Sequence, residues 1–231
     1  KEFAAQRADV SWIFGLCGLV YFVLGAGGGM LADRWGPRMV CMTGMVFIAM
    51  GLFLTSLAQS LATVYLSYGL LVGLGIAFVY TPSIACVQPW FNKRRGLASG
   101  IASAGVGAGT LVLPVVVSYL LIEVNWREAL QMMSAGVLLI GLTAGFLLKR
   151  APKLSGNTSG QLPGLTLSAT LKTPSFKWLY MGTLLGAPVM FVPFAHISAA
   201  ARDAGVPDAQ AVGLVGLIGI GSLVGRFAIG W

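Results

Sequence analysis

Long runs of apolar residues alternate with short polar connections along this chain. Each run approaches or exceeds the about 20 residues that an α-helix needs to cross the hydrocarbon core of a bilayer. Glycine is frequent inside the runs, which suits close helix packing in lipid. We place seven runs at Val10–Leu31, Met39–Leu57, Ala62–Val87, Leu97–Ile122, Ala129–Leu148, Trp178–Ala199 and Ala209–Trp231. The pattern predicts an all-α polytopic membrane protein with seven transmembrane helices.

Composition agrees with this class and explains the net charge of +8. The chain is 57% hydrophobic and only 10% charged, with a mean hydropathy of +0.84. Basic residues follow the first, third and fifth runs, where Asp33 is the one acid: Arg34, Arg38, Lys93, Arg94, Arg95, Lys149, Arg150, Lys153, Lys172 and Lys177. By the positive-inside rule these three connections are cytoplasmic. The positive charge therefore orients the protein in a bilayer, and we expect no nucleic-acid partner.

The sequence carries no pattern that indicates catalysis. Cys17, Cys41 and Cys86 lie inside apolar runs and lack the spacing of metal ligands. The glycine-rich stretch Gly100–Gly109 lacks the Gly-Lys-Ser/Thr ending of a phosphate loop. No carboxylate pair lies within the apolar runs. We therefore predict that the protein is not an enzyme and has neither a metal site nor a cofactor.

One long polar connection divides the chain. Residues 151–175 are rich in Gly, Ser and Pro and are interpreted as a cytosolic linker between two helical bundles. Within it, Leu165–Leu171 is expected to form a short interfacial helix. The chain lacks an initiator Met and stops inside an apolar run, so we expect it to be part of a longer protein.

The runs on either side of the linker resemble each other. A shift of 201 residues lays Gly15-Leu16-Cys17-Gly18 over Gly216-Leu217-Ile218-Gly219, and it lays Gly25 over Arg226. Duplication of a helical unit explains this match better than chance does. Parallel repeats of membrane helices are an architecture of secondary transporters, with the substrate site near the midplane between the halves.

Arg226 is the residue with the strongest functional implication, because it lies inside the last apolar run. Its guanidinium stays protonated in proteins, and such a charge at the centre of a membrane helix costs about 2.5–3.5 kcal/mol. Its paired N–H donors match a carboxylate, as lysine cannot. We therefore predict a buried cationic site for an anion. The alternative is an arginine that is structural or reaches toward the cytosol, since it lies about 25 Å into its helix.

Other polar side chains in the runs are candidates for the same site. Ser222 precedes Arg226 by four residues and so shares its helix face. Tyr80 lies within the third run, where its hydroxyl is able to bind a carboxylate and its ring to line a cavity; plain packing is the alternative. Two Gly-x-x-x-Gly pairs, Gly25/Gly29 and Gly105/Gly109, are assigned to helix packing.

The connection between the first two runs reads Gly29-Met-Leu-Ala-Asp33-Arg34-Trp-Gly36-Pro37-Arg38. Gly36-Pro37 makes a tight turn, and Asp33 is able to cap a helix or pair with arginine. This stretch resembles the cytoplasmic loop signature of the major facilitator superfamily, G-x-x-x-D-R-x-G-R-R. Pro37 stands where that signature usually has arginine, which puts one basic contact in doubt.

Further segments resemble the monocarboxylate transporter branch, which includes the oxalate/formate antiporter relatives: Tyr80-Thr-Pro82, Trp90–Gly109, Asn125-Trp126-Arg127 and Leu171–Phe176. The resemblance implies a partial major facilitator fold, from the second to the eighth of twelve helices. Residues 1–150 would be an N-terminal bundle that lacks its first helix. Residues 176–231 would be the first two helices of the C-terminal bundle.

The resemblance also implies roles for individual residues. Arg226 matches the eighth-helix arginine that binds the substrate carboxylate. His196 and Asp203 match groups that line the substrate site and couple transport to protons; histidine is the residue type whose ordinary pKa lies nearest neutral pH. For these two, an interfacial imidazole and a solvated loop carboxylate are the alternatives. The short cytoplasmic loops would latch that side shut through Gly29, Asp33, Arg34, Gly36, Arg38, Arg94 and Arg95.

We therefore expect a secondary active transporter of lactate- or pyruvate-like monocarboxylates, driven by proton symport through alternating access. The alternatives are an oxalate/formate-type antiporter and a non-transporting receptor or sensor. A retinal pump is disfavoured, because the last run lacks a lysine. Expected partners are a small carboxylate, protons and the lipid bilayer, with the protein acting as a monomer. The expected location is a bacterial inner membrane.

Overall fold

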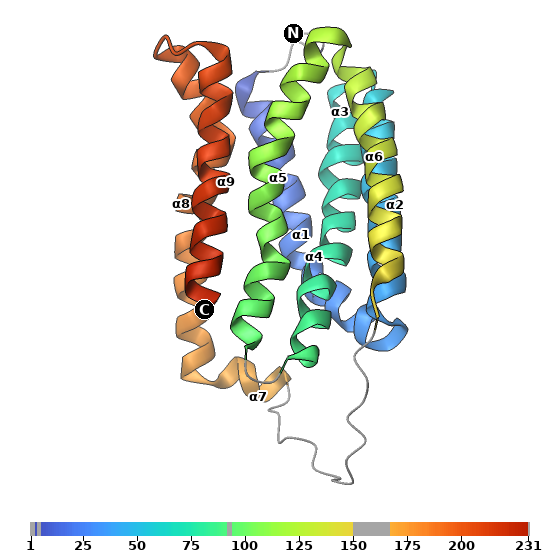
Figure 1. The fold of residues 1–231 in the computed structure, drawn as a ribbon, viewed down its shortest axis with the longest axis vertical. Helices are drawn as coiled ribbons and strands as arrows, with labels where there is room; N and C mark the ends of the chain where they lie inside the picture. The colour runs from blue at the N-terminus through green and yellow to red at the C-terminus, as the bar shows by residue number, and fades with distance from the viewer. Residues whose placement is uncertain (1–2, 4–5, 92–93, 150–166, 231) are drawn as a thin grey trace. The chain divides into compact units, whose positions relative to one another are not determined.

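The computed structural model describes residues 3, 6–91, 94–149 and 167–230, with some side chains inside the helices left out. In these ranges the chain is helical and contains no strand. The elements are α1 Arg7–Trp35, α2 Pro37–Ser56, α3 Leu61–Val64, the π-helix η1 Tyr65–Val72, α4 Gly73–Val87, the 3-10 turn η2 Gln88–Trp90, α5 Arg95–Glu123, α6 Trp126–Leu147, α7 Leu167–Lys172, α8 Pro174–Asp203 and α9 Asp208–Gly230. Figure 1 shows their order.

Six helical segments of the described residues are long and apolar enough to cross a membrane: 8–35, 37–56, 61–90, 96–123, 126–147 and 208–228. The predicted class, an all-helical multi-pass membrane protein, is confirmed. The seventh expected span, Trp178–Ala199, lies in α8, which is not among these six. Several side chains of α8 lie outside the described residues, so that span stays a prediction.

The chain divides into two compact units. Residues 1–151 form the first unit together with residues 216–231, and residues 152–215 form the second. Helix α9 therefore begins in the second unit and ends in the first. Most of the expected linker, residues 150–166, lies outside the described residues. The short helix expected at Leu165–Leu171 is present as α7, over Leu167–Lys172.

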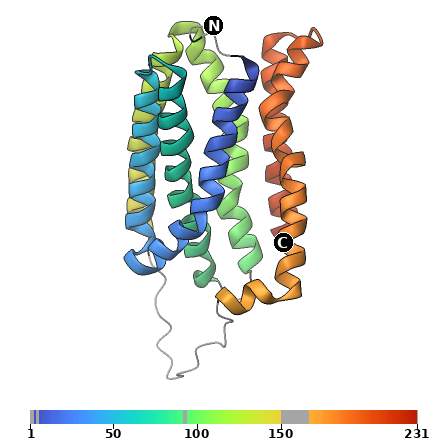
Figure 2. The same cartoon turned by 180° about the vertical axis from the view of Figure 1, so that it is seen from behind.

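Close contacts between glycines hold the first unit together. α1 packs on α4, and α2 packs on both α4 and α6 (Figure 2). A Cβ atom added at Gly44 of α2 would lie 2.8 Å from the Gly75 carbonyl oxygen, and one added at Gly75 would lie 2.7 Å from that of Gly44. Small residues at such points let helix backbones touch, which drives helix association in lipid. Cys17, Leu52 and Val72 form the buried core beside these contacts.

The ends of the first unit agree with the predicted grouping of the connections. The turn between α1 and α2 lies at the same end as the connection between α4 and α5 (Figure 1). The α2–α3 and α5–α6 connections lie at the opposite end. The tight turn itself is confirmed at Gly36, whose φ of +93° favours glycine, with Pro37 as the first residue of α2.

Candidate functional site

Arg226 lies about 27 Å along α9 from Asp208, at a rise of about 1.5 Å per residue. Its side chain is partly buried within the first unit. Nε donates a hydrogen bond to Oγ of Ser222 over 3.0 Å, and Nη1 donates to the main-chain oxygen of Ser103 in α5 over 2.8 Å. Among the described residues, no carboxylate pairs with this guanidinium. Its charge is therefore solvated by neutral oxygens and available to an anion.

A backbone contact between α5 and α9 places Ser103 beside Arg226. A Cβ atom added at Gly219 would lie 2.7 Å from the Gly107 carbonyl oxygen, and one added at Gly107 would lie 3.0 Å from that of Gly219. Gly107 follows Ser103 by one helical turn, and Gly219 precedes Arg226 by about two turns. The close approach of the two helices thus brings the α5 backbone within reach of the arginine.

The glycine pair expected on α5 is not the one in contact. A Cβ atom added at Gly105 would meet nothing within 4 Å, and one added at Gly109 would meet only its own helix, at Leu113. Gly107, midway between them, faces α9 instead. The Gly-x-x-x-Gly pattern predicts that α5 packs closely, but in a helix so rich in glycine it does not determine which face does so.

Two tyrosines of the first unit, Tyr21 and Tyr80, pack against each other. Tyr80 of α4 stacks edge-on against Tyr21 of α1, with ring centroids 5.6 Å apart and planes at 90°. The charge of Arg226 acts on the Tyr21 hydroxyl. Arg226 thus bonds to Ser222 and to the Ser103 carbonyl, and Tyr80 pairs with Tyr21; that these side chains form one binding site stays a prediction.

The packing of α1 on α4 fixes the tyrosine pair. A Cβ atom added at Gly25 would lie 3.2 Å from Oγ1 of Thr81, and one added at Gly28 would lie 2.5 Å from the Ala77 carbonyl oxygen. Gly28, rather than Gly29 of the loop motif, is thus the closest approach. Sequence reasoning missed Tyr21, although it showed the same signal as Tyr80: a polar aromatic residue near the middle of an apolar run.

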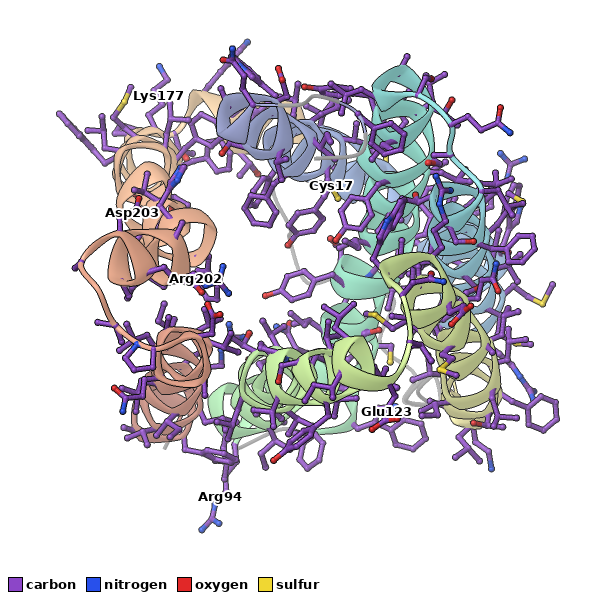
Figure 3. All side chains as sticks on the ribbon, turned by 90° about the horizontal axis from the view of Figure 1, so that it is seen from above. Cys17, Arg94, Glu123, Lys177, Arg202 and Asp203 are labelled. Atoms are coloured by element: carbon purple, nitrogen blue, oxygen red, sulfur yellow. The ribbon has the colours of Figure 1, made fainter. Side chains whose placement is uncertain are left out.

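His196 and Asp203 belong to α8 in the second unit and are described separately from the Arg226 region. The helix continues unbroken between them, so the two residues, seven positions apart, share a face. Both are exposed within this unit. Figure 3 shows Asp203 and Arg202 at the last turn of α8, where Arg202 pairs with Asp208 over 2.7 Å.

The loop motif occupies the turn between α1 and α2. Asp33 and Arg34 lie in the last turn of α1. The guanidinium carbon of Arg38 lies 3.6 Å from the centre of the Phe146 ring in α6, so this arginine links α2 to α6.

Arg94 is the N-cap residue of α5, and its side chain projects outward in Figure 3. The side chain of Arg95 lies outside the described residues.

The three cysteines are free thiols. In the described part of the chain, no group of three or more His, Cys, Asp or Glu side chains is placed to hold a metal ion. The chemistry that this arrangement supports is recognition of an anion by an arginine, with hydroxyl groups beside it.

These observations define a multi-pass helical membrane protein in which an arginine of α9 bonds to the backbone of α5. The chain belongs to the major facilitator superfamily, whose sequence pattern matches residues 1–231. Monocarboxylate transporter 13 of Bos taurus is 36% identical over 230 residues, which are 99% of this chain and 53% of that protein. Monocarboxylate transporter 11 of Mus musculus is 33% identical over 235 residues, covering 100% of this chain and 52% of that protein.

A fungal relative extends the comparison. The fujikurins efflux protein of Gibberella fujikuroi is 29% identical over 227 residues, covering 98% of this chain and 48% of that protein. The chain thus spans about half the length of these curated relatives. The predicted resemblance to monocarboxylate transporters is confirmed. The expected bacterial inner membrane is not supported, because these relatives come from animals and fungi; the resemblance identifies the family but not the kind of cell.

Proposed function

We propose that the chain is the larger part of one half of a secondary transporter for small carboxylates, together with the start of the second half, and that Arg226 binds the carboxylate. The observation that carries this proposal is the guanidinium inside an apolar span, bonded to two neutral oxygens and to no carboxylate among the described residues. An anion compensates such a charge better than neutral acceptors do. The names of the animal relatives support a monocarboxylate as the anion.

The remaining hydrogen-bonding capacity of the site fits one carboxylate. A guanidinium has five N–H donors, and two of those on Arg226 are used by Ser222 and Ser103. Nη2 donates to no other described residue and remains available to the substrate. Ser222 accepts from Nε, so its own hydroxyl proton is free to donate to a bound anion. Arg226 and Ser222 together thus offer donors from one helix face.

We propose that Tyr21 and Tyr80 also line the site. Their perpendicular rings present apolar surface to a short carbon chain, and their hydroxyls are potential donors to its polar end. A site with one cation and two aromatic walls favours a small monocarboxylate such as lactate or pyruvate. A dicarboxylate would need a second cation.

Transport would follow from alternating access, with the site exposed first to one side of the bilayer and then to the other. We propose proton coupling through His196 and Asp203, which share a face of α8.

We propose that residues 151–175 connect the two bundles and that the loops at Asp33–Arg38 and Arg94–Arg95 close the cytoplasmic side. Exchange of carboxylates is the second candidate, favoured because no acid in the described part of the chain pairs with Arg226.

Counterflow of labelled lactate into proteoliposomes containing the full-length protein tests the proposal. Arg226→Lys keeps the charge but loses the fork of donors, and Arg226→Ala loses both; we expect each to reduce uptake by at least about 100-fold. Arg202→Lys is the matched control, because it changes an exposed arginine outside the site. Undiminished uptake with Arg226→Ala would reject the role of Arg226. A pH gradient that drives net uptake supports symport, whereas uptake that requires internal carboxylate supports exchange.

A further inference from the structure

Helices α5 and α9 meet along a contact that ends at Arg226. We call this contact the α5–α9 seam and define it by Ser103, Gly107 and Leu111 of α5 and by Gly216, Gly219, Leu223 and Arg226 of α9. The intervals of three and four residues place each set on one helix face. The glycines contribute backbone contacts, whereas Arg226 contributes the one hydrogen bond between the helices that the structure shows in the described part of the seam.

The hydrogen bond between α5 and α9 uses the guanidinium of Arg226, which is also the group that we propose binds the carboxylate. Nη1 donates to the Ser103 carbonyl on α5, and Nε donates to Ser222, which lies on α9 itself. Each of the two forks of the guanidinium, Nε–Nη2 and Nη1–Nη2, therefore has one nitrogen already engaged. Nη1 carries two protons, and only the one that points toward Nη2 belongs to the Nη1–Nη2 fork. A carboxylate that binds at this fork leaves the bond to Ser222 intact and approaches the Ser103 carbonyl, which lies 2.8 Å from the same nitrogen.

We propose that the Ser103 carbonyl holds the Nη1 proton of the Nη1–Nη2 fork and that the carboxylate substrate displaces it, so that substrate binding releases the Arg226 end of the α5–α9 seam. This inference rests on the proposed carboxylate-binding role of Arg226. An ionised carboxylate is a stronger acceptor for a guanidinium than a neutral carbonyl is. In the empty carrier the carbonyl solvates the arginine; in the loaded carrier the substrate does, and α9 is free to move relative to α5.

Loosening the seam tests this competition. Gly219→Ala or Gly107→Ala would place a Cβ within 3.0 Å of the opposing carbonyl oxygen and push the helices apart. Because the carbonyl then competes less well, we expect the dissociation constant for labelled lactate on the purified full-length protein to fall roughly three- to tenfold. Gly221→Ala and Gly105→Ala are matched controls, since a Cβ there meets nothing within 4 Å. We expect them to leave affinity unchanged.

A merely structural seam gives the opposite result: the seam variants would bind lactate equally or more weakly, which would overturn the proposal. Because those variants also strain the helix packing, a second measurement avoids them and uses single cysteines in a background without the native ones. Leu223→Cys lies in the seam, and Val224→Cys is exposed and serves as its control. Saturating lactate should raise the rate of maleimide labelling about threefold or more at position 223 only.

The two proposals fail in distinguishable ways. If the unmodified protein binds no lactate or other small carboxylate, the proposed function fails, and the competition fails with it. If the protein binds lactate but the labelling at position 223 does not change, only the competition is rejected. Faster labelling at both positions would indicate a general loosening and would also reject it.

Discussion

The main-chain oxygen of Ser56, the last residue of α2, accepts a hydrogen bond from Nη1 of Arg127 over 2.6 Å. Arg127 lies in the first turn of α6, and its guanidinium carbon is 4.5 Å from the centre of the neighbouring Trp126 ring. The last carbonyls of a helix lack partners within the helix, so an arginine from a packed neighbour both satisfies one and fixes the helix end. This bond joins α2 and α6 at the end opposite to the Arg38–Phe146 contact.

Removing this donor should destabilise the protein. Arg127→Met keeps the apolar stem but leaves the Ser56 carbonyl, in a residue only 1% exposed, with one bond fewer. We expect a loss of about 1–3 kcal/mol, seen as a lower midpoint in thermal unfolding of the purified full-length protein. Arg202→Met is the control, since its pair with Asp208 is exposed and contributes little. Equal midpoints for the two variants would show that the bond to Ser56 is dispensable.

The contact of α2 with α4 should be intolerant of any side chain. Gly75→Ala would place a Cβ 2.7 Å from the Gly44 carbonyl oxygen and 2.6 Å from Cγ1 of Ile48, so the helices must separate. We expect the free energy of unfolding to fall by about 2 kcal/mol or more. We also expect a poor yield of monodisperse protein in size-exclusion chromatography. Gly136→Ala in α6 is the control, because its Cβ meets nothing within 4 Å. A well-behaved Gly75→Ala protein would contradict the packing described here.

The sequence predicts the helices because hydrophobic run length is a direct physical requirement of the bilayer. It also predicts the turn at Gly36-Pro37, where one residue needs a positive φ. It does not predict the π-helix Tyr65–Val72, which interrupts an otherwise regular apolar span. There Gly69 packs on Leu16 and Gly51 packs on Val72, and these tertiary contacts leave no trace in the local hydrophobic pattern.

The site was predictable in part for a similar reason. Arg226 stands out because a charge in an apolar run is costly, and Ser222 follows from helical spacing. The pairing of Tyr21 with Tyr80 arises from packing between α1 and α4, and the bond of Arg226 to the Ser103 carbonyl arises from packing between α5 and α9. Such contacts depend on which face of a glycine-rich helix turns inward. His196 and Asp203 lie in the second unit, and their participation in the same site as Arg226 stays a prediction.

The tyrosine hydroxyls are testable separately from their rings. Tyr21→Phe and Tyr80→Phe keep the edge-on aromatic pair and remove only the donors. If a hydroxyl binds the carboxylate, its loss should raise the dissociation constant for labelled lactate about three- to tenfold. Tyr119→Phe is the control, because Tyr119 is 69% exposed near the far end of α5. Unchanged affinity in both variants would limit the tyrosines to lining the site.

A carboxylate introduced at position 222 should block the site. Ser222→Asp places an acid where the hydroxyl now accepts from Nε of Arg226 over 3.0 Å. The ion pair would neutralise the guanidinium and compete with substrate, so we expect lactate affinity to fall at least about tenfold. Ser222→Asn offers a neutral acceptor of similar size and should bind lactate nearly as well as the unmodified protein. An equal loss in both variants would indicate a steric effect, and undiminished affinity with Ser222→Asp would show that the substrate does not use this charge.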